Sequence, residues 1–595
     1  MRRIVLLALF FIVLPGICLY GQHVFHVSVM GNDNNSGSKS RPLRTISAAA
    51  RLAQPGDIIT VHQGVYRERI DPPRGGISDT RRIIYQAAQG EKVEIKGSEI
   101  IRNWRKIDYD TWKAVIPNSF FGDFNPYIDT IHGDWFEGRG RLHHTGEVYL
   151  DGLALTEAAD IQTVLQPSKD TSYWYCQTIR DSTAIWAQFR NTDPNSKQVE
   201  INVRQTIFYP KKTGINYITL RGFIMKQAAT PWAPPTAEQI GLIGTHWSKG
   251  WIIEDNSISD SKNSGIALGK YGDQWDNKAE SAEGYVGTIK RALGDGWNGE
   301  TVGHHIVRNN LIFDCGQAGI VGSLGAIFST ITYNSIHDIH IRQRYTGAEV
   351  AGIKLHGAID VKIAHNHIYH NIRGIWLDWM AQGTRVESNL FHDNRLHDLY
   401  MEVDHGPFLI NNNIFLSDIA LFDRSEGGAF THNLVTGRIK GGGPEERKTP
   451  YFQPHSTKLV DIVNLEGGDI RFYNNVFCRR DALDTFKKAA PLIVIEGNVF
   501  LTEKINWRWQ GDSVFLEIPT SIHVDHPRVT TTLLGKTKLV REAFELPDAS
   551  PISINTDYFG QKRNTPDSWS GPFRLSEDKA HHIKVWPLPG KNKPT

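Results

Sequence analysis

The chain has 595 residues, with 66 basic and 64 acidic side chains and a formal charge of +2. This balance gives no electrostatic reason to expect nucleic acid or an anionic membrane as a partner. Hydrophobic residues make up 40% and charged residues 22%, as in soluble globular proteins. A chain of this length would ordinarily hold roughly three or four domains, but a solenoid absorbs the whole length as one unit.

Residues 1–22 have the three parts of a secretory signal peptide. Two arginines precede an apolar run at 4–14, and small and polar residues follow it. The run is shorter than the ~20 apolar residues that span a bilayer, and no other segment approaches that length. Cys18 would suit a lipid anchor, but Ile17 stands before it where such signals usually have a small residue. Export to the periplasm or the extracellular space, without an anchor, is the favoured prediction.

The mature chain keeps three cysteines, Cys176, Cys315 and Cys478. They are odd in number and widely spaced, so they predict neither a disulfide framework nor a metal site. We therefore expect no metal and no cofactor, and stability that comes from packing.

The first elements in chain order, at 23–98, are predicted to be the opening coils of a solenoid. Within them, residues 45–53 (TISAAARLA) form a short amphipathic helix in this prediction. Such a helix would cap the core, because a terminal coil otherwise exposes apolar interior and unpaired strand edges.

The next segment, 99–209, loses the pattern of short strands. Its predicted strands are longer, and it is rich in tryptophan. We interpret it as an inserted β-rich domain and predict that its fold is a β-sandwich. The tryptophans in question are Trp104, Trp112, Trp135, Trp174 and Trp186.

A three-residue phrase recurs through the core at 210–595: Asn, any residue, then an aliphatic or aromatic residue. Where no loop intervenes the interval is 24 residues, as from Asn310 to Asn334, or 23, as from Asn366 to Asn389. The longer intervals fit one coil plus an inserted loop, such as the polar excursion at 271–300 with its predicted helix at 279–293. The phrase begins at Asn256, Asn310, Asn334, Asn366, Asn389, Asn413, Asn433, Asn475 and Asn498.

Short alternating stretches, such as GIKLH at 352–356, lie between these phrases and predict strands. Three short strands every 22 to 24 residues indicate a right-handed parallel β-helix. The fold class is therefore all-β, a solenoid with an inserted β-sandwich. The repeated Asn would sit at a turn, adopt left-handed backbone and stack its amide in a ladder.

The repeat places two carboxylates in register. Asp378 lies eleven residues before Asn389, and Glu402 lies eleven before Asn413. Parallel strands are about 4.8 Å apart, so the two side chains should stack at roughly 5 Å. Glycoside hydrolysis needs two carboxyl groups, at ~5–5.5 Å in retaining enzymes and roughly 6.5–9.5 Å in inverting ones. The register favours retention, with one carboxyl keeping its proton.

Neighbouring residues favour a sugar site. Lys354 and His356 hold the corresponding position one coil earlier, and Trp376 and Trp379 flank Asp378. Polar groups suit sugar hydroxyls and aromatic faces suit sugar C–H surfaces, although packing alone would also explain the two tryptophans. Asp404 and His405 complete the cluster, and either residue could instead belong only to a turn.

Several long runs resemble glycoside hydrolase family 120, the β-xylosidases with a β-helix core and an intervening β-sandwich. The resemblance covers most of the mature chain. It is carried by FFGDFNPY at 120–127, ATPWAPPT at 229–236, WSKGWIIEDN at 247–256, AGIKLH at 351–356, WLDW at 376–379, AQGTRV at 381–386, and Glu402 with HGP at 405–407.

This resemblance implies an exo-acting enzyme on xylo-oligosaccharides, with Asp378 as nucleophile and Glu402 as acid/base. It adds Glu349 as a carboxylate that binds sugar hydroxyls, places Trp232 and His405 among the substrate-binding residues, and suggests self-association. Ala348, Met380 and Asp404 depart from the family pattern and leave the sugar open among xylose, arabinose and fucose. The insert at 99–209 and the loop at 339–351 predict a short, blocked pocket.

Two other functions stay open at this point. A calcium-dependent polysaccharide lyase would hold the ion with Asp378, Glu402 and Asp404 and use Lys354 or Arg385 as the base. A non-catalytic carbohydrate-binding solenoid would bind sugar without turnover. The fold alone does not decide among them.

Overall fold

The computed structural model describes residues 21–441, 443–489, 493–518, 525–563, 567–575 and 581–589. The predicted signal peptide, except for its last two residues, lies outside this part of the chain. None of the helices in the described ranges has the length and apolar character needed to cross a membrane.

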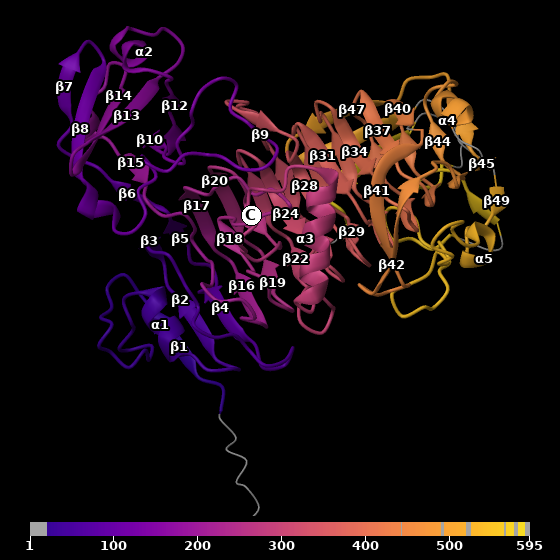
Figure 1. The fold of residues 1–595 in the computed structure, drawn as a ribbon, viewed down its shortest axis with the longest axis horizontal. Helices are drawn as coiled ribbons and strands as arrows, with labels where there is room; N and C mark the ends of the chain where they lie inside the picture. Colours follow the sequence, from indigo (N-terminus) through magenta and orange to yellow (C-terminus); the bar gives the residue numbers. More distant parts are fainter. Residues whose placement is uncertain are drawn as a thin grey trace, which may run out of the picture.

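Three long parallel sheets wind along the longest axis of the molecule and form the predicted parallel β-helix (Figure 1). The first sheet contains β1 (Val24–Val27), β2 (Ile58–Val61), β4 (Ile83–Ala87), β16 (Ile218–Arg221), β19 (Ile252–Glu254), β22 (Ile306–Arg308), β25 (Thr330–Thr332), β29 (Lys362–Ala364), β32 (Thr384–Glu387), β35 (Phe408–Asn411), β38 (Gly428–Thr431), β43 (Ile470–Tyr473) and β45 (Ile493–Glu496). The second contains β3 (Gly64–Tyr66), β5 (Val93–Lys96), β17 (Ile224–Ala228), β20 (Ser257–Ser261), β23 (Leu311–Phe313), β26 (Ser335–His337), β30 (His367–Tyr369), β33 (Leu390–His392), β36 (Ile414–Phe415), β39 (Leu434–Val435), β44 (Val476–Phe477) and β46 (Val499–Phe500). The third contains β18 (Ile243–Gly244), β21 (Ile266–Ala267), β24 (Ala318–Ser323), β28 (Ala351–His356), β31 (Arg373–Asp378), β34 (His397–Glu402), β37 (Ile419–Arg424) and β40 (Arg438–Gly441).

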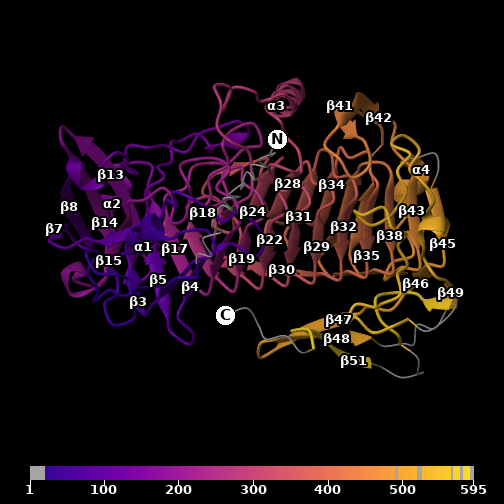
Figure 2. The ribbon, with the colours of Figure 1, turned by 90° about the horizontal axis from the view of Figure 1, so that it is seen from below.

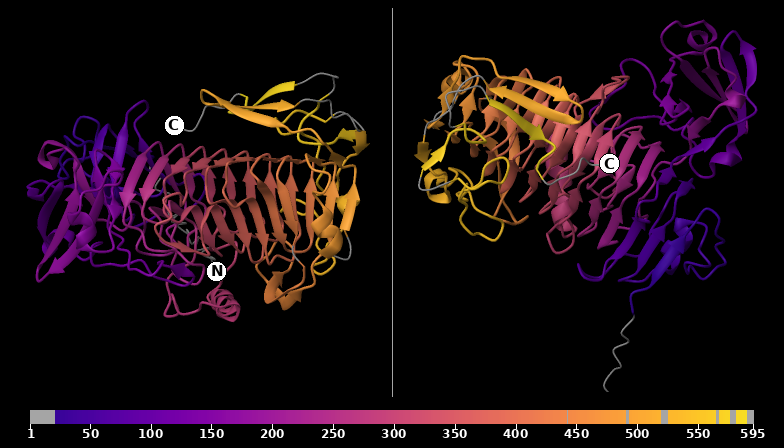
Figure 3. Two further views of the ribbon diagram at one scale, coloured as in Figure 1. Left: turned by 90° about the horizontal axis from the view of Figure 1, so that it is seen from above. Right: turned by 180° about the vertical axis from the view of Figure 1, so that it is seen from behind.

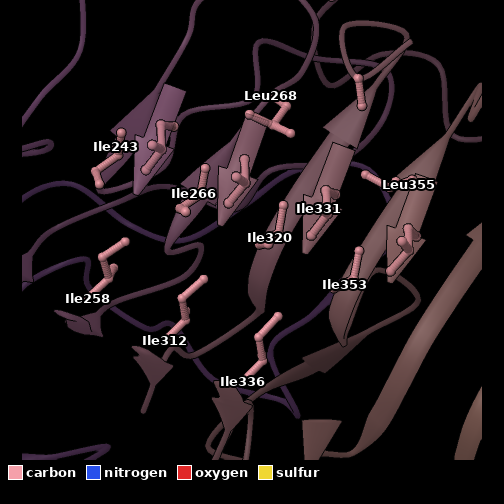
Figure 4. Packing of buried hydrophobic residues seen from close by; sticks show 14 of the residues in the cluster. Ile243, Ile258, Ile266, Leu268, Ile312, Ile320, Ile331, Ile336, Ile353 and Leu355 are labelled. Atoms are coloured by element: carbon pink, nitrogen blue, oxygen red, sulfur yellow. The ribbon is translucent and has the colours of Figure 1, made fainter. Parts of the chain in front are cut away.

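The core of the solenoid consists of aliphatic columns that repeat from coil to coil. In the third sheet Ile266 pairs with Ile320, and Ile320 pairs with Ile353. Ile312 and Ile336 form a second column from the second sheet, and both columns point into the shared interior (Figure 4). These side chains are fully buried, and each contributes about 1.5–3 kcal/mol to stability through burial. Alternate residues therefore face outward, where they are free to form a site.

The repeated asparagines form one continuous ladder, as predicted. Asn389 Nδ2 donates to Asn413 Oδ1 at 3.0 Å, and Asn366 Nδ2 donates to Asn389 Oδ1 at the same distance. The same bond joins each asparagine of the phrase to the next, from Asn256 to Asn498. The predicted left-handed backbone falls one residue earlier, for example at Ser388 (φ 54°). The asparagine amide thus fixes the turn, while its neighbour adopts the unusual conformation.

The amino-terminal cap is the helix α1 (Ile46–Leu52), which lies where the sequence predicts it. The Thr45 hydroxyl accepts a hydrogen bond from the backbone N–H of Ala48 and so caps the first turn. The buried face of the helix packs against the first coils. The cap closes the apolar interior at this end of the solenoid.

Two mainly antiparallel sheets branch from the solenoid between its early coils. They enclose a core of their own, to which Trp174 and Ile185 contribute from one sheet and Val148 and Ile201 from the other. This arrangement is the inserted β-sandwich of the predicted fold class. Its elements are β6 (Ser98–Ile100), β7 (Arg105–Asp108), β8 (Thr111–Pro117), η1 (Asn118–Phe121), β10 (Val148–Leu150), β11 (Leu153–Ala154), β12 (Thr156–Glu157), α2 (Ile161–Leu165), β13 (Tyr173–Ile179), β14 (Ser182–Gln188), η2 (Pro194–Ser196) and β15 (Val199–Asn202).

Two excursions rise from the same side of the solenoid (Figure 2). One carries the helix α3 (Ala282–Gly294), and the other is the hairpin of β41 (Glu445–Phe452) and β42 (Leu459–Leu465). A third segment, the short strand β9 (Phe136–Glu137) of the insert, pairs with β27 (Thr346–Gly347) of the solenoid. These three additions surround the outer face of the third sheet.

The solenoid coils end at β46, so the segment after Phe500 adds no further coil to the core predicted for 210–595. A small sheet of β47 (Asn506–Gln510), β48 (Ser513–Ile518) and β51 (His581–Trp586) runs along the side opposite α3 and the hairpin (Figure 3). It buries apolar residues against the second sheet. The remaining elements are α4 (Asp484–Ala489), β49 (Asp525–Pro527), α5 (Thr531–Leu534) and β50 (Asp567–Trp569).

Candidate active site

The two predicted carboxylates lie in register at the ends of adjacent strands. Asp378, the last residue of β31, pairs with Glu402, the last residue of β34. The residues that follow, Trp379 (φ 55°) and Val403 (φ 62°), turn the chain in left-handed conformation. His356 occupies the same strand-end position one coil earlier and pairs with Asp378. Strand pairing and a repeated turn therefore place all three side chains on one outer face.

Asp378 is buried and uses only one of its two oxygens. Lys354 Nζ donates to Oδ2 at 2.5 Å, and His356 Nε2 lies 3.2 Å from the same oxygen. Oδ1 is buried without a hydrogen-bond partner. Burial by itself would raise the pKa of Asp378, but the charges of Lys354 and His356 outweigh burial and hold it well below its usual range. Asp378 is thus an ionised carboxylate with one free oxygen.

Glu402 has the opposite electrostatic environment. Burial and the negative charge of Asp378 raise its pKa, although Arg447 opposes the shift. Arg447 Nη2 donates to Oε1 at 2.8 Å, and Trp376 Nε1 donates to Oε2 at 3.1 Å. The two carboxyl groups have pKa values pushed apart, which is the arrangement that separates a nucleophile from a general acid.

Trp376 lies in the column between Lys354 and Tyr400, and both of its faces are occupied. Lys354 Nζ lies 3.4 Å from the centre of the indole, Arg373 lies 4.6 Å from it, and Tyr400 stacks at 5.1 Å. Trp376 therefore offers its edge and its N–H group to the site. Its N–H group orients the Glu402 carboxyl, and its covered faces are not available for the predicted stacking on a sugar.

Glu349 and His356 supply two more polar atoms that lack a hydrogen bond, although the Lys354 ammonium lies 3.6 Å from Glu349 Oε2. Glu349 Oε2 and His356 Nδ1 are buried, 4.0 Å apart, and neither has a hydrogen bond. Tyr285 of α3 packs edge-on against the His356 ring at a centroid distance of 5.1 Å. Together with Asp378 Oδ1, three unsatisfied polar atoms converge where a ligand's hydroxyl groups and reacting carbon would lie.

A cavity with about 310 Å³ of free space connects these groups. The solenoid supplies its floor, and the insert, α3 and the β41–β42 hairpin supply its walls. Most of the sequence-predicted residues are present. The lining residues are Trp135, Pro235, Ser281, Ala282, Tyr285, Ala348, Glu349, His356, Arg373, Trp376, Asp378, Trp379, Tyr400, Glu402 and Arg447.

Three predicted substrate-binding residues do not line the cavity. Lys354 is fully buried behind Asp378. Trp232 is buried beneath Gly347, where its Nε1 donates to the Asp134 carbonyl at 3.0 Å. His405 has both ring nitrogens engaged, one with Glu426 at 2.7 Å and one with the Thr449 carbonyl at 3.1 Å. These residues support the site from behind.

Nine lining residues were absent from the site prediction, and five of these have aromatic or charged side chains. Tyr400 could have been found, because it precedes Glu402 by two residues as Trp376 precedes Asp378. Arg373 begins the strand that carries Asp378. Trp135, Tyr285 and Arg447 come from segments that carry no repeat, so the spacing gave no information about their position.

Two of the residues proposed for a calcium-dependent lyase, Asp404 and Arg385, are not placed to act with Asp378 and Glu402. Asp404 accepts hydrogen bonds from the Ala381 backbone at 2.7 Å and from the Ser425 hydroxyl at 3.1 Å, so both of its oxygens are used. Arg385 lies in the first sheet, on another face of the solenoid from Asp378. Ligand atoms of Glu349, His356 and Asp378 lie within 4.8 Å of one another, but the Lys354 ammonium already neutralises Asp378.

Comparisons with known proteins agree with this geometry. A family model described as the insertion domain of glycoside hydrolase 120 matches residues 101–201, and a right-handed β-helix region matches residues 241–443. A family of unknown function matches residues 29–72. An uncharacterised Bacillus subtilis protein, YwoF, is 32% identical over 75 residues, which cover 13% of this chain and 16% of YwoF.

Among solved structures, the complex of XylC with xylose superposes with a TM-score of 0.90 at 38% identity, covering 95% of this chain and 100% of XylC. A structure described as a glycoside hydrolase has a TM-score of 0.45 at 12% identity, covering 80% of this chain and 96% of its own. The pectate lyase Pel9A has a TM-score of 0.34 at 10% identity, covering 80% and 78%.

Proposed function

Because this chain belongs to glycoside hydrolase family 120, we propose that it is a retaining, exo-acting β-xylosidase that uses Asp378 and Glu402. One observation carries the proposal: Asp378 and Glu402 are in register on adjacent strands, and Asp378 keeps one oxygen without a partner. A strand spacing of about 4.8 Å suits a nucleophile and an acid, because inversion needs a wider gap for water.

In the first step Asp378 Oδ1 forms a bond to the anomeric carbon while the bond from that carbon to the leaving oxygen breaks. Glu402 gives its proton to the leaving oxygen, so the departing sugar or alcohol is neutral. Lys354 and His356 hold Oδ2 and keep Asp378 ionised and oriented. Trp376 and Arg447 fix the Glu402 carboxyl next to the scissile bond.

In the second step Glu402, now ionised, takes a proton from water, whose oxygen bonds to the anomeric carbon and displaces Asp378. Two inversions give net retention. Glu349 Oε2 and His356 Nδ1 are placed to hydrogen-bond the hydroxyl groups of the bound sugar. Xylose as that sugar is supported by the 38% identity to XylC, whose solved structure contains xylose.

A screen of aryl glycosides with the purified protein tests the proposal. We expect the highest kcat/KM on the β-xyloside, compared with the α-arabinofuranoside and β-fucoside. Proton NMR at early times should show β-xylose before mutarotation. Initial release of α-xylose would contradict the retaining mechanism, and a clear preference for another sugar would contradict the substrate.

Export and self-association remain proposals. The amino-terminal sequence pattern supports secretion, and an oligosaccharide substrate is compatible with a periplasmic or extracellular location. Cell fractionation and amino-terminal sequencing of the secreted chain test the first proposal, and light scattering of the purified enzyme tests the second.

A further inference from the structure

A second cluster of ligand-type side chains lies outside the catalytic cavity. Asp360, His455 and Glu542 each offer one ligand atom, and these atoms all lie within 4.8 Å of one another. Asp360 belongs to the turn between β28 and β29, His455 to the turn of the β41–β42 hairpin, and Glu542 to the segment after α5. Three segments far apart in sequence therefore meet at one point.

The charges in this cluster do not balance. His455 Nδ1 lies 3.0 Å from both oxygens of Asp360, and His455 Nε2 lies 3.4 Å from Glu545 Oε1. Within the described ranges, no lysine or arginine forms an ion pair with Asp360, Glu542 or Glu545. Three carboxyl groups therefore share one imidazole, and a cation would neutralise the negative charge of those that are ionised.

An unpartnered oxygen points into the cluster. Glu542 is 2% exposed and its Oε2 accepts a hydrogen bond from Gln382 Nε2 at 2.7 Å, but its Oε1 is buried without any partner. That oxygen and Asp360 Oδ1 both approach Gly383, where an added Cβ would lie 3.5 Å and 2.1 Å from them. An unsatisfied buried carboxylate oxygen is costly unless something binds it.

We propose that Asp360, His455 and Glu542 bind one divalent transition-metal cation, with Zn²⁺ the best fit. One imidazole nitrogen and two carboxylate oxygens are ligands that zinc accepts, whereas calcium and magnesium prefer oxygen alone. The metal takes the position between His455 Nδ1 and Asp360, and Glu545 orients the ring through Nε2. A cavity of about 440 Å³ borders Asp360 and His455 and gives water access to the remaining coordination positions.

The metal would link the β41–β42 hairpin, which carries His455 and lines the catalytic cavity through Arg447, to the solenoid turn that carries Asp360. Gln382 joins Glu542 to Phe452 of β41, whose carbonyl accepts from Gln382 Nε2 at 2.9 Å. The same strand carries Arg447, which contacts Glu402. The proposed metal site rests on Asp360, His455 and Glu542 alone and does not depend on the proposed catalytic mechanism.

The test is calorimetric titration of the full-length, EDTA-treated protein with zinc, manganese or calcium chloride. We expect one zinc per chain, tighter binding of zinc than of calcium, and a Tm that rises with zinc. Glu542→Gln and His455→Gln should each weaken zinc binding by at least about tenfold. Loss of an outer-shell partner already has an effect of this size, and loss of a direct ligand should have no smaller one.

Two matched variants serve as controls. Glu300→Gln changes an exposed residue at the rim of the same 440 Å³ cavity, and Glu349→Gln changes the other His-carboxylate cluster. Both should keep the zinc affinity and the zinc-dependent rise in Tm. The Tm of each metal-free variant shows whether it is folded.

Each of the following results would overturn the proposal: no saturable zinc binding to the parent protein, unchanged affinity in both folded ligand variants, or loss of binding in Glu349→Gln. Tighter binding of calcium than of zinc would also overturn it, because the site contains an imidazole ligand.

Discussion

Asp378 and Glu402 are both buried carboxyls at strand ends, and their surroundings give them different protonation states. Lys354 and His356 meet Asp378 directly, and their positive charges keep it ionised. Glu402 faces that negative charge, and the positive charges of Arg447 and Lys354, with Arg424 3.5 Å from Oε1, offset it only in part. The chemical roles therefore follow from neighbours one coil away.

Substitution of Asp378 and substitution of Glu402 should each impair a different step of catalysis. Asp378→Ala should abolish turnover on every substrate, because no covalent glycosyl-enzyme can form. Glu402→Ala should lose activity on xylobiose and alkyl xylosides, whereas activated aryl xylosides still glycosylate the enzyme and then stall. Added azide should restart the stalled enzyme and give a β-glycosyl azide, which NMR identifies.

The anomer of the azide product distinguishes the assignments. An α-azide from Glu402→Ala, or equal losses of activity on good and poor leaving groups, would mean that the roles of the two carboxyls are assigned wrongly.

Substitution of Arg447 should shift the alkaline limb of the pH profile of kcat/KM. Activity requires protonated Glu402, so it falls as pH rises through the pKa of Glu402, and it requires ionised Asp378, whose lowered pKa puts the other limb at acid pH. Arg447→Met removes a positive charge that lowers the pKa of Glu402. The alkaline limb should therefore move up by about one pH unit.

Arg438→Met is the control for this profile. Arg438 is an exposed arginine on β40, in the same sheet as Glu402, and it does not line the cavity. Its profile should match that of the parent enzyme. An unchanged or lower alkaline limb in Arg447→Met would show that Arg447 does not act on the proton of Glu402.

At the scale of elements, the asparagine ladder joins the coils and sets the register on which the carboxylate pair depends. Asn389 is fully buried, and its Nδ2 donates both to Asn413 and to the Ile363 carbonyl. Asn389→Ala leaves several buried groups without partners, so it should lower the free energy of unfolding by about 3 kcal/mol. Denaturant unfolding followed by circular dichroism measures this loss.

Asn498→Ala is the matched control, because Asn498 is the last rung of the ladder and is only half-buried. It should lower the free energy of unfolding by clearly less than Asn389→Ala does. Equal losses at the two positions would mean that the interior ladder contributes little beyond an ordinary turn.

The same ladder explains which parts of the molecule the sequence predicts. The spacing from Asp378 to Asn389 equals that from Glu402 to Asn413, so the pair and its register follow from counting residues. Trp135 and Arg447 belong to segments outside the repeat, and only the folded chain brings them to the cavity. His405 and Trp232 lie in distinctive motifs, but a motif does not show on which side of a turn a side chain points.

At the scale of the whole molecule, additions from three places convert an open solenoid face into a pocket. A plain β-helix exposes its outer face along its full length, which suits a long polymer. Here β9 pairs with β27, and Trp135 of the insert, Tyr285 of α3 and Arg447 of the hairpin line the cavity around Asp378. The walls come from both directions along the solenoid axis, so a polymer cannot lie across the catalytic coils.

This enclosure predicts cleavage from chain ends. With long xylan, xylose should be the first and main product at all times, and xylobiose and xylotriose should not accumulate early, because a pocket of about 310 Å³ holds only a chain end. Borohydride-reduced xylotriose, whose reducing end is blocked, should still release xylose if the enzyme acts from the non-reducing end. Chromatography of timed samples follows both reactions. A mixed ladder of oligosaccharides before free xylose, with a rapid fall in xylan viscosity, would show internal cleavage and contradict the closed pocket.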